Sequence, residues 1–186
     1  MHKKIIGTIL AGILLSMFGC GGSKMLSESY MREGASVAHI RTLAVLPFIG
    51  DARAQRIREL TITHLLASGL FDVLDTGRVD SVLRREGISA GTAIDLQDIK
   101  RLGNQLNAQA LLFGTVEESR DARGSASFAV ITMTLRLIDT ETGVLLWQAS
   151  GKASGYSIAD RLFGMAPKDP FAVTLNLLGE LFATMQ

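Results

Sequence analysis

Apolar residues recur along this 186-residue chain in three patterns, and each pattern predicts one kind of element. Two nearly unbroken apolar runs, at 42–48 and 109–116, favour strands that are buried on both faces. From Ile131 to Leu137 apolar and polar residues alternate, which is typical of a strand with one buried face and one wet face. Apolar positions spaced three and four residues apart predict amphipathic helices.

This helical spacing defines four segments with recognisable ends. Asp75 or Thr76, and Asp95 together with Asp98, are expected at helix N-termini, where side-chain oxygens can accept hydrogen bonds from unpaired backbone N–H groups. Gly69 is the expected C-terminal cap of the first helix. The expected helical ranges are 52–68, 79–86, a third from about 95, and 171–185.

The remaining segments complete a sheet. A short strand is expected at 70–74, a polar connection at 117–126, a turn at 139–143 and a partner strand at 144–153. That partner strand carries Trp147, which is expected to be at least partly buried. The element order is β-α-β-α-α-β-β-β-α, and the predicted fold class is α/β, a single domain with a mixed sheet and helices packed on it.

The N-terminus has the layout of a secretory signal peptide. A basic head of His2, Lys3 and Lys4 precedes an uncharged apolar stretch and then small residues around Cys20, the only cysteine. The uncharged stretch 5–23 also has the length of a membrane span, so an uncleaved anchor helix is one alternative. A cytoplasmic protein without export is the other. Five glycines dilute this stretch, which favours cleavage.

The leader resembles the bacterial lipoprotein signal, in which the cysteine is lipidated and becomes the new N-terminus. Met17 departs from the leucine usual at its position, whereas Gly19 before Cys20 fits. Gly21 is not the aspartate used for inner-membrane retention, so the resemblance implies the periplasmic side of the outer membrane. The expected organisation is a signal peptide (1–19), a lipid-anchored flexible tether (20–39) and a periplasmic domain (40–186).

Composition excludes several classes of protein. The net charge is only +1 and no block of like charge occurs, so no nucleic-acid partner is expected. A single cysteine excludes a disulfide framework. With 47% hydrophobic residues, the chain can instead form its own core.

The search for reactive residues yields little. Residues 87–91 match the G-x-S-x-G pattern of hydrolases, but Ser89 follows a predicted helix rather than the strand that this motif requires. His39 lies in the predicted tether and His64 in a predicted helix, and neither has a partner at metal-ligand spacing. Asp139 and Glu141 fit a turn better than a catalytic pair. We therefore expect no catalytic residue, metal, cofactor or small-molecule substrate.

Four segments carry a family resemblance: TLAVLPF, LLASGLFDVLDTGRVDSVLRREGIS, LGNQLNAQALLFGTV and LRLIDTETGVLLWQAS. Together they resemble the periplasmic domain of CsgG-type lipoproteins, which include the curli secretion subunit. The wider relatives are the FlgO flagellar lipoproteins, the penicillin-binding-protein activator lipoproteins and the N-terminal domain of TolB. The resemblance covers about 42–153 and implies a non-enzymatic protein that assists envelope assembly or secretion.

CsgG-type channel subunits carry two long amphipathic hairpins that form the pore. Here the corresponding segments, 117–126 and 154–168, are too short for such hairpins, so no pore is expected. Two alternatives are an activator that binds a cell-wall synthase and, from another class, a lipid-anchored hydrolase using Ser89. The short tether weighs against the activator.

The chain is also expected to form homo-oligomers. The first and last helices carry apolar residues on more than one face. On the last helix, Phe171, Leu175, Leu178 and Phe182 are expected to face the core. The candidate oligomer contacts are Ile62 and Leu66 on the first helix and Leu177 and Leu181 on the last.

Overall fold

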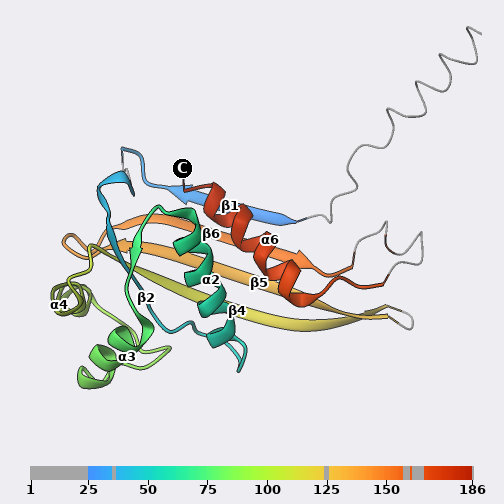
Figure 1. Ribbon diagram of the computed structural model, residues 1–186, viewed down its shortest axis with the longest axis horizontal. Helices are drawn as coiled ribbons and strands as arrows, with labels where there is room; N and C mark the ends of the chain where they lie inside the picture. The colour runs from blue at the N-terminus through green and yellow to red at the C-terminus, as the bar shows by residue number, and fades with distance from the viewer. Residues whose placement is uncertain (1–24, 35–36, 124–125, 157–159, 161–165, 186) are drawn as a thin grey trace, which may run out of the picture.

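One six-stranded mixed sheet organises the domain (Figure 1). The computed structural model describes residues 25–34, 37–123, 126–156, 160 and 166–185. The strands follow the order β1-β6-β5-β4-β2-β3; β2 pairs in parallel with β3 and β4, and the other pairs are antiparallel. The strands are β1 (Leu26–Met31), β2 (Thr42–Val45), β3 (Asp72–Val73), β4 (Ala110–Arg123), β5 (Ala126–Asp139) and β6 (Leu145–Ser154).

The helices are joined to this sheet in the predicted order. They are the short 3-10 helix η1 (Val37–His39) and the α-helices α2 (Ala54–Ser68), α3 (Thr76–Arg85), α4 (Leu96–Leu106) and α6 (Pro170–Ala183). The predicted caps are confirmed: Asp75 and Asp95 accept backbone hydrogen bonds at the starts of α3 and α4, and Gly69 ends α2 with a positive φ of 66°. The predicted α/β class and order are confirmed, with β1 as one additional strand.

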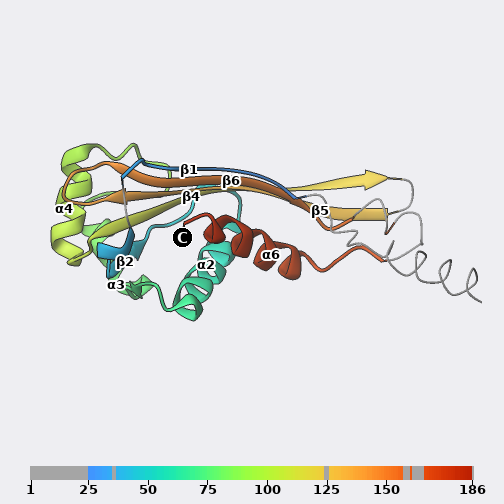
Figure 2. The same cartoon turned by 90° about the horizontal axis from the view of Figure 1, so that it is seen from above.

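Two hydrophobic clusters lie on opposite sides of β2. Leu43 and Val45 belong to the larger cluster, which α2 and α6 cover from one face of the sheet (Figure 2). Ala44 and Leu46 belong to the smaller cluster, which α3 and α4 complete. The alternation confirms that this strand is buried on both faces. Beyond the smaller cluster, the same face over β5 and β6 is wet, with Thr132, Arg136 and Lys152 exposed.

The segment predicted to be a flexible tether contains β1, so that prediction is wrong for Leu26–Met31. β1 pairs along its whole length with β6, from Leu26 opposite Lys152 to Met31 opposite Trp147. Its side chains are mostly exposed, so the strand lacks an apolar pattern that sequence inspection could detect. Backbone pairing with the edge of β6 determines its structure.

The polar connection predicted at 117–126 is also wrong. β4 and β5 are each 14 residues long and pair in continuous register from Ala110 opposite Asp139 to Arg123 opposite Ala126. The hairpin projects beyond the helices (Figure 2). Because the segment is not a short loop, the argument from its length against a pore-forming hairpin does not hold at this position. The second segment, 154–168, lies partly outside the described residues.

The buried face of α6 matches the predicted one only in part: Leu178 and Phe182 are buried as expected. Phe171 is 50% exposed, whereas Leu177 and Leu181 are fully buried. The reason is Gly151 on β6: a side chain there would begin 2.8 Å from Leu177 Cδ1 and 3.0 Å from Leu181 Cδ2. The missing side chain lets this face of α6 approach the sheet closely.

Candidate functional site

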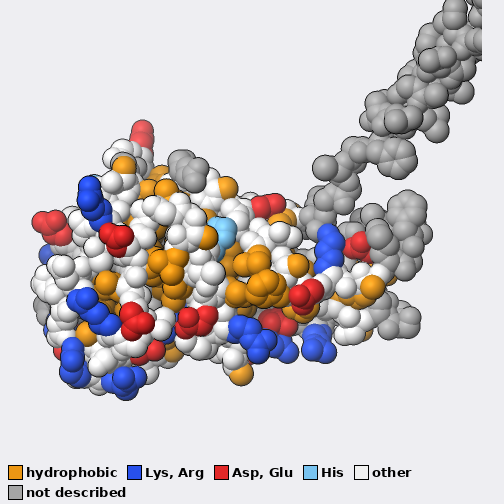
Figure 3. Space-filling model, viewed as in Figure 1, with side chains coloured by type: hydrophobic (Ala, Val, Ile, Leu, Met, Phe, Trp, Pro, Cys, Tyr) orange, Lys and Arg blue, Asp and Glu red, His pale blue; other side chains and the backbone are white. Residues whose placement is uncertain are grey.

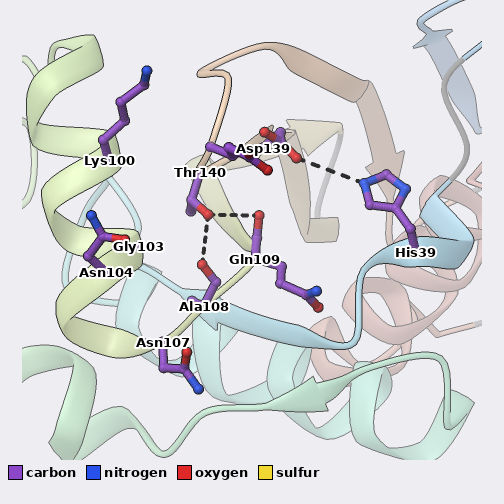
Figure 4. Close-up of a pocket in the computed structure, with 10 residues that line it drawn as sticks. His39, Lys100, Gly103, Asn104, Asn107, Ala108, Gln109, Asp139 and Thr140 are labelled. Carbon is purple, nitrogen blue, oxygen red and sulfur yellow. Dashed lines mark hydrogen bonds and ion pairs between the residues drawn. The ribbon is translucent and has the colours of Figure 1, made fainter.

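A polar cleft opens at the end of the sheet opposite the projecting hairpin (Figure 4). It has a volume of about 540 Å³ and lies where the start of β4 and the end of β5 meet α4 and η1. Its walls therefore come from three stretches that are far apart in the sequence, namely His39, residues 100–109 and residues 139–141. The lining residues are His39, Lys100, Gly103, Asn104, Asn107, Ala108, Gln109, Asp139, Thr140 and Glu141.

Asp139 provides a fixed negative charge on one wall. Its Oδ1 accepts hydrogen bonds of 2.7 Å from both the backbone N–H and the hydroxyl of Thr142, and its Oδ2 lies 3.8 Å from His39 Nε2. Burial raises the pKa of Asp139, but the hydrogen bonds from Thr142 and Glu141 and the attraction of His39 outweigh it and lower the pKa below 3.8. The carboxylate is thus charged at neutral pH.

Gln109 and Thr140 join the cleft floor to the sheet. Gln109 Oε1 accepts from the backbone N–H of Arg41 at 2.6 Å and of Thr42 at 3.2 Å. The Thr140 hydroxyl donates to the carbonyls of Ala108 at 2.7 Å and Gln109 at 3.0 Å (Figure 4). The single proton of this hydroxyl is shared between the two carbonyls and holds the start of β4 to the end of β5.

Helix α4 is fixed at both ends. Asp95 and Asp98 form a reciprocal capping box at its start. Glu86, just after α3, binds Arg101 Nε at 2.6 Å and accepts from Gln105 Nε2 at 2.6 Å. The hydrogen bond from Gln105 is the largest of the effects that lower the pKa of Glu86, and Arg101 adds to it; burial of the carboxyl opposes them.

Close packing sets the distance between α4 and the sheet. Gly103 allows it, because a side chain there would overlap Thr140. Lys100 and Asn104 then stand one helical turn apart along the cleft (Figure 4). Asn107 ends α4 in the left-handed conformation with φ 53°.

This set of groups suits binding rather than bond making. The cleft offers amide donors and acceptors, one lysine, one histidine and two carboxylates. Its one hydroxyl, on Thr140, is directed at the backbone carbonyls of Ala108 and Gln109 and not at a histidine or a carboxylate that could act as a general base. Among the described residues, no group of three or more His, Cys, Asp or Glu side chains could hold a metal ion.

The structure places Ser89 in the loop after α3, as predicted. Its side chain is exposed and its hydroxyl lies 3.1 Å from Thr92 Oγ1. His39 is at the cleft and His64 stacks on Phe182, with ring centroids 5.5 Å apart. Neither histidine is among the hydrogen-bond partners of Ser89.

The four candidate oligomer contacts are not alike. Leu177 and Leu181 are buried within the domain, so they are not available to another subunit and that part of the prediction is wrong. Ile62 is partly buried against the larger cluster. Leu66 is 55% exposed on the α2 side, where apolar side chains reach the surface (Figure 3). Cys20, the predicted lipidation site, lies outside the described residues.

Sequence inspection missed two features of this domain. The cleft was missed because its walls lie about 30 to 100 residues apart in the chain, although Asp139 and Glu141 were noticed as a turn. The buried Arg58 was missed because a lone arginine on a helix has no distinguishing pattern.

Within the described residues, every helix is too short or too polar to span a bilayer.

A family model for "Peptidoglycan-synthase activator LpoB" matches residues 54–153, which is more than half of the chain. The chain belongs to the LpoB family. The matched region begins with α2 and ends in β6, so it includes residues 100–109 and 139–141, two of the three stretches that line the cleft. No curated protein matches the sequence.

Solved structures show the same fold at low sequence identity. PelC from Paraburkholderia phytofirmans, solved as a dodecamer, has a TM-score of 0.58 and 18% identity over 88% of this chain and 98% of its own. Lipoprotein GNA1162 from Neisseria meningitidis has a TM-score of 0.55 and 17% identity over 77% and 94%. CT253 from Chlamydia trachomatis has a TM-score of 0.51 and 14% identity over 78% and 95%.

The family match confirms one of the wider relatives named from the sequence, the penicillin-binding-protein activators, and the CsgG type expected first is not shown. The penicillin-binding-protein activators were expected only as relatives, behind the CsgG type. The family match reverses that order.

Proposed function

We propose that this protein is a non-enzymatic, lipid-anchored protein of the outer membrane that binds and activates a peptidoglycan synthase in the periplasm. The observation that carries the proposal is the family match over residues 54–153. The polar cleft supports it, because a cleft lined by amides and by charges of both signs is suited to recognising another molecule. In this proposal the partner is a protein, the synthase, and binding to it raises its activity.

The leader supports the location. A basic, then apolar segment ending at the sole cysteine favours export and lipidation of Cys20. Several acyl chains, each methylene contributing about 0.8 kcal/mol, would hold the domain at the membrane. Intact mass of the membrane-extracted protein tests this step. A Cys20→Ser variant found in the outer membrane at the mature mass would contradict it.

The cleft offers a direct test of synthase binding. Asn104→Arg places a long charged side chain among the lining residues on an exposed helical position, so the fold should be kept. We expect the affinity for the purified synthase to fall at least about tenfold, which corresponds to about 1.4 kcal/mol. Stimulation of glycan-strand synthesis should fall in parallel.

Gln97→Arg is the matched control. Gln97 is exposed on the same helix and does not line the cleft, so the same change of amide to guanidinium should leave binding unchanged. Equal losses in both variants would exclude the cleft as the binding surface. No stimulation of the synthase by the unaltered protein would refute the proposed function itself.

Self-assembly is a second candidate, supported by the likeness to the PelC dodecamer over 88% of this chain. Leu66 and the exposed Leu70 are the apolar residues of α2 and its exit that a neighbouring subunit would cover. Lipid anchors would concentrate subunits in two dimensions and favour such a ring. Light scattering of the mature protein measures its mass directly, and a strict monomer at high concentration would exclude this candidate.

A further inference from the structure

The start of β1 lies in a defined row across the sheet. Leu26 is opposite Lys152, Lys152 is opposite Thr132, and Thr132 is opposite Glu117. This row crosses the long hairpin about halfway between its tip and the cleft. From the row to the tip, β4 runs six residues, from Glu117 to Arg123, or about 20 Å.

The chain from Cys20 to β1 is equally short. Leu26 is six residues beyond Cys20, so the two Cα atoms can be at most about 21 Å apart. Cys20 therefore only just reaches the level of the hairpin tip, and only if the connection is fully extended along the hairpin. If the connection between Cys20 and Leu26 is less than fully extended, Cys20 lies beside the distal half of the hairpin or beside the edge of the sheet that β1 forms.

The opposite orientation exceeds this reach. From the same row towards the cleft, the chain runs eight residues, from Glu117 back to Gln109, or about 26 Å, and α4 extends the domain further. With the strands upright on the membrane, the cleft end therefore cannot rest on the lipid while Cys20 is in the membrane.

From these distances, and given the lipidation of Cys20 proposed above, we propose that the distal half of the β4–β5 hairpin rests on the phospholipid headgroups and the cleft faces away from the membrane. The hairpin surface is compatible with headgroups: Glu117, Ser119 and Arg120 are exposed, and it carries hydroxyls and charges of both signs. Such a surface contacts the headgroup layer and does not enter the hydrocarbon. The 14 residues of β4 hold the cleft about 46 Å from the hairpin tip.

This orientation limits the distance from the membrane at which the protein can bind the synthase. The domain cannot leave the membrane, so a partner must come within about 50 Å of the lipid surface, the sum of the connection, about 21 Å, and the stretch from the row to the cleft, about 26 Å. The tether expected from the sequence would have allowed a wider range.

Fluorescence quenching measures the orientation. The full lipidated chain is placed in vesicles of phosphatidylethanolamine and phosphatidylglycerol that carry a nitroxide on a fraction of the headgroups. A fluorophore is attached at Ser119→Cys on the hairpin or, as the matched control, at Asn104→Cys on α4; both positions are exposed. The thiol of Cys20 is consumed by its lipid and does not react, and intact mass verifies that state.

We expect several-fold stronger quenching at Ser119→Cys than at Asn104→Cys. Inserting twelve Gly and Ser residues between Gly22 and Ser23 should reduce the quenching at Ser119→Cys towards the control value, because the connection then no longer holds the hairpin down. Equal quenching at both positions, stronger quenching at Asn104→Cys, or no effect of the insertion would overturn the inference. None of these quenching measurements involves a synthase. They can therefore refute the orientation without refuting synthase activation, and a failure of synthase activation would not refute the orientation.

Discussion

Arg58 is the residue whose replacement tests the architecture most sharply. Its side chain is 0% exposed, although it carries a full charge. Its Nη2 lies 2.9 Å from Asp80 Oδ1 and its Nη1 donates to Asp80 Oδ2 at 3.2 Å. Nε and Nη2 also donate to the carbonyl of Val45 at 3.1 and 2.8 Å. One guanidinium thus joins α2 to α3 and to the end of β2.

The expected cost of Arg58→Met follows from what the change leaves behind. Breaking a buried ion pair by removing one partner costs about 3–5 kcal/mol. The Asp80 side chain is 33% exposed, so water can solvate part of its charge. We therefore expect the lower end of that range, about 3 kcal/mol of unfolding free energy. Arg58→Lys keeps the charge but cannot form the forked contact, so its cost should be intermediate.

Denaturant unfolding followed by fluorescence provides the assay, because the single tryptophan is buried. Arg56→Met, at an exposed position of the same helix, is the control and should change stability by no more than about 0.5 kcal/mol. A double-mutant cycle with Asp80→Asn should show a coupling of at least about 1 kcal/mol. Additive effects, or a loss below about 1 kcal/mol for Arg58→Met, would refute the reasoning.

Three further predictions concern single side chains. Trp147→Ala should cost about 3–5 kcal/mol, because the indole is fully buried and donates to Thr184 Oγ1 at 3.0 Å; a loss under about 1 kcal/mol in the same denaturation assay would be inconsistent with that burial. The lowered folded pKa of Asp139 contributes stability that is complete above the unfolded pKa, near 3.9, and is lost as the pH falls through the folded value. The stability difference between the unaltered protein and Asp139→Asn should therefore shrink below about pH 4, and a pH-independent difference would contradict it. Ser89→Ala should change stability by no more than about 0.5 kcal/mol and leave synthase activation intact, whereas labelling of Ser89 by a serine-hydrolase probe would show that it is a nucleophile.

Elements whose signals are local can be predicted from the amino-acid sequence. Apolar runs and alternation identified β2, the start of β4 and the β5–β6 pair, because burial of one or both strand faces requires those periods. The caps at Asp75, Asp95 and Gly69 were readable because each satisfies backbone groups within a few residues. The element order then led to an α/β sheet with helices packed on it.

Elements and sites that depend on a partner far away in the sequence become visible only in the folded chain. β1 and the polar half of the hairpin are strands because β6 and β5 pair with their backbones, a condition that their own side chains do not encode. The face of α6 that is buried depends on the missing side chain of Gly151. In the same way, the cleft exists only because the fold brings His39, Gln109 and Asp139 together, and Arg58 is buried only because α3 delivers Asp80 to it. Local patterns specify elements through their own hydrogen bonds and periodicity, whereas sites arise from contacts between elements that only the folded chain creates.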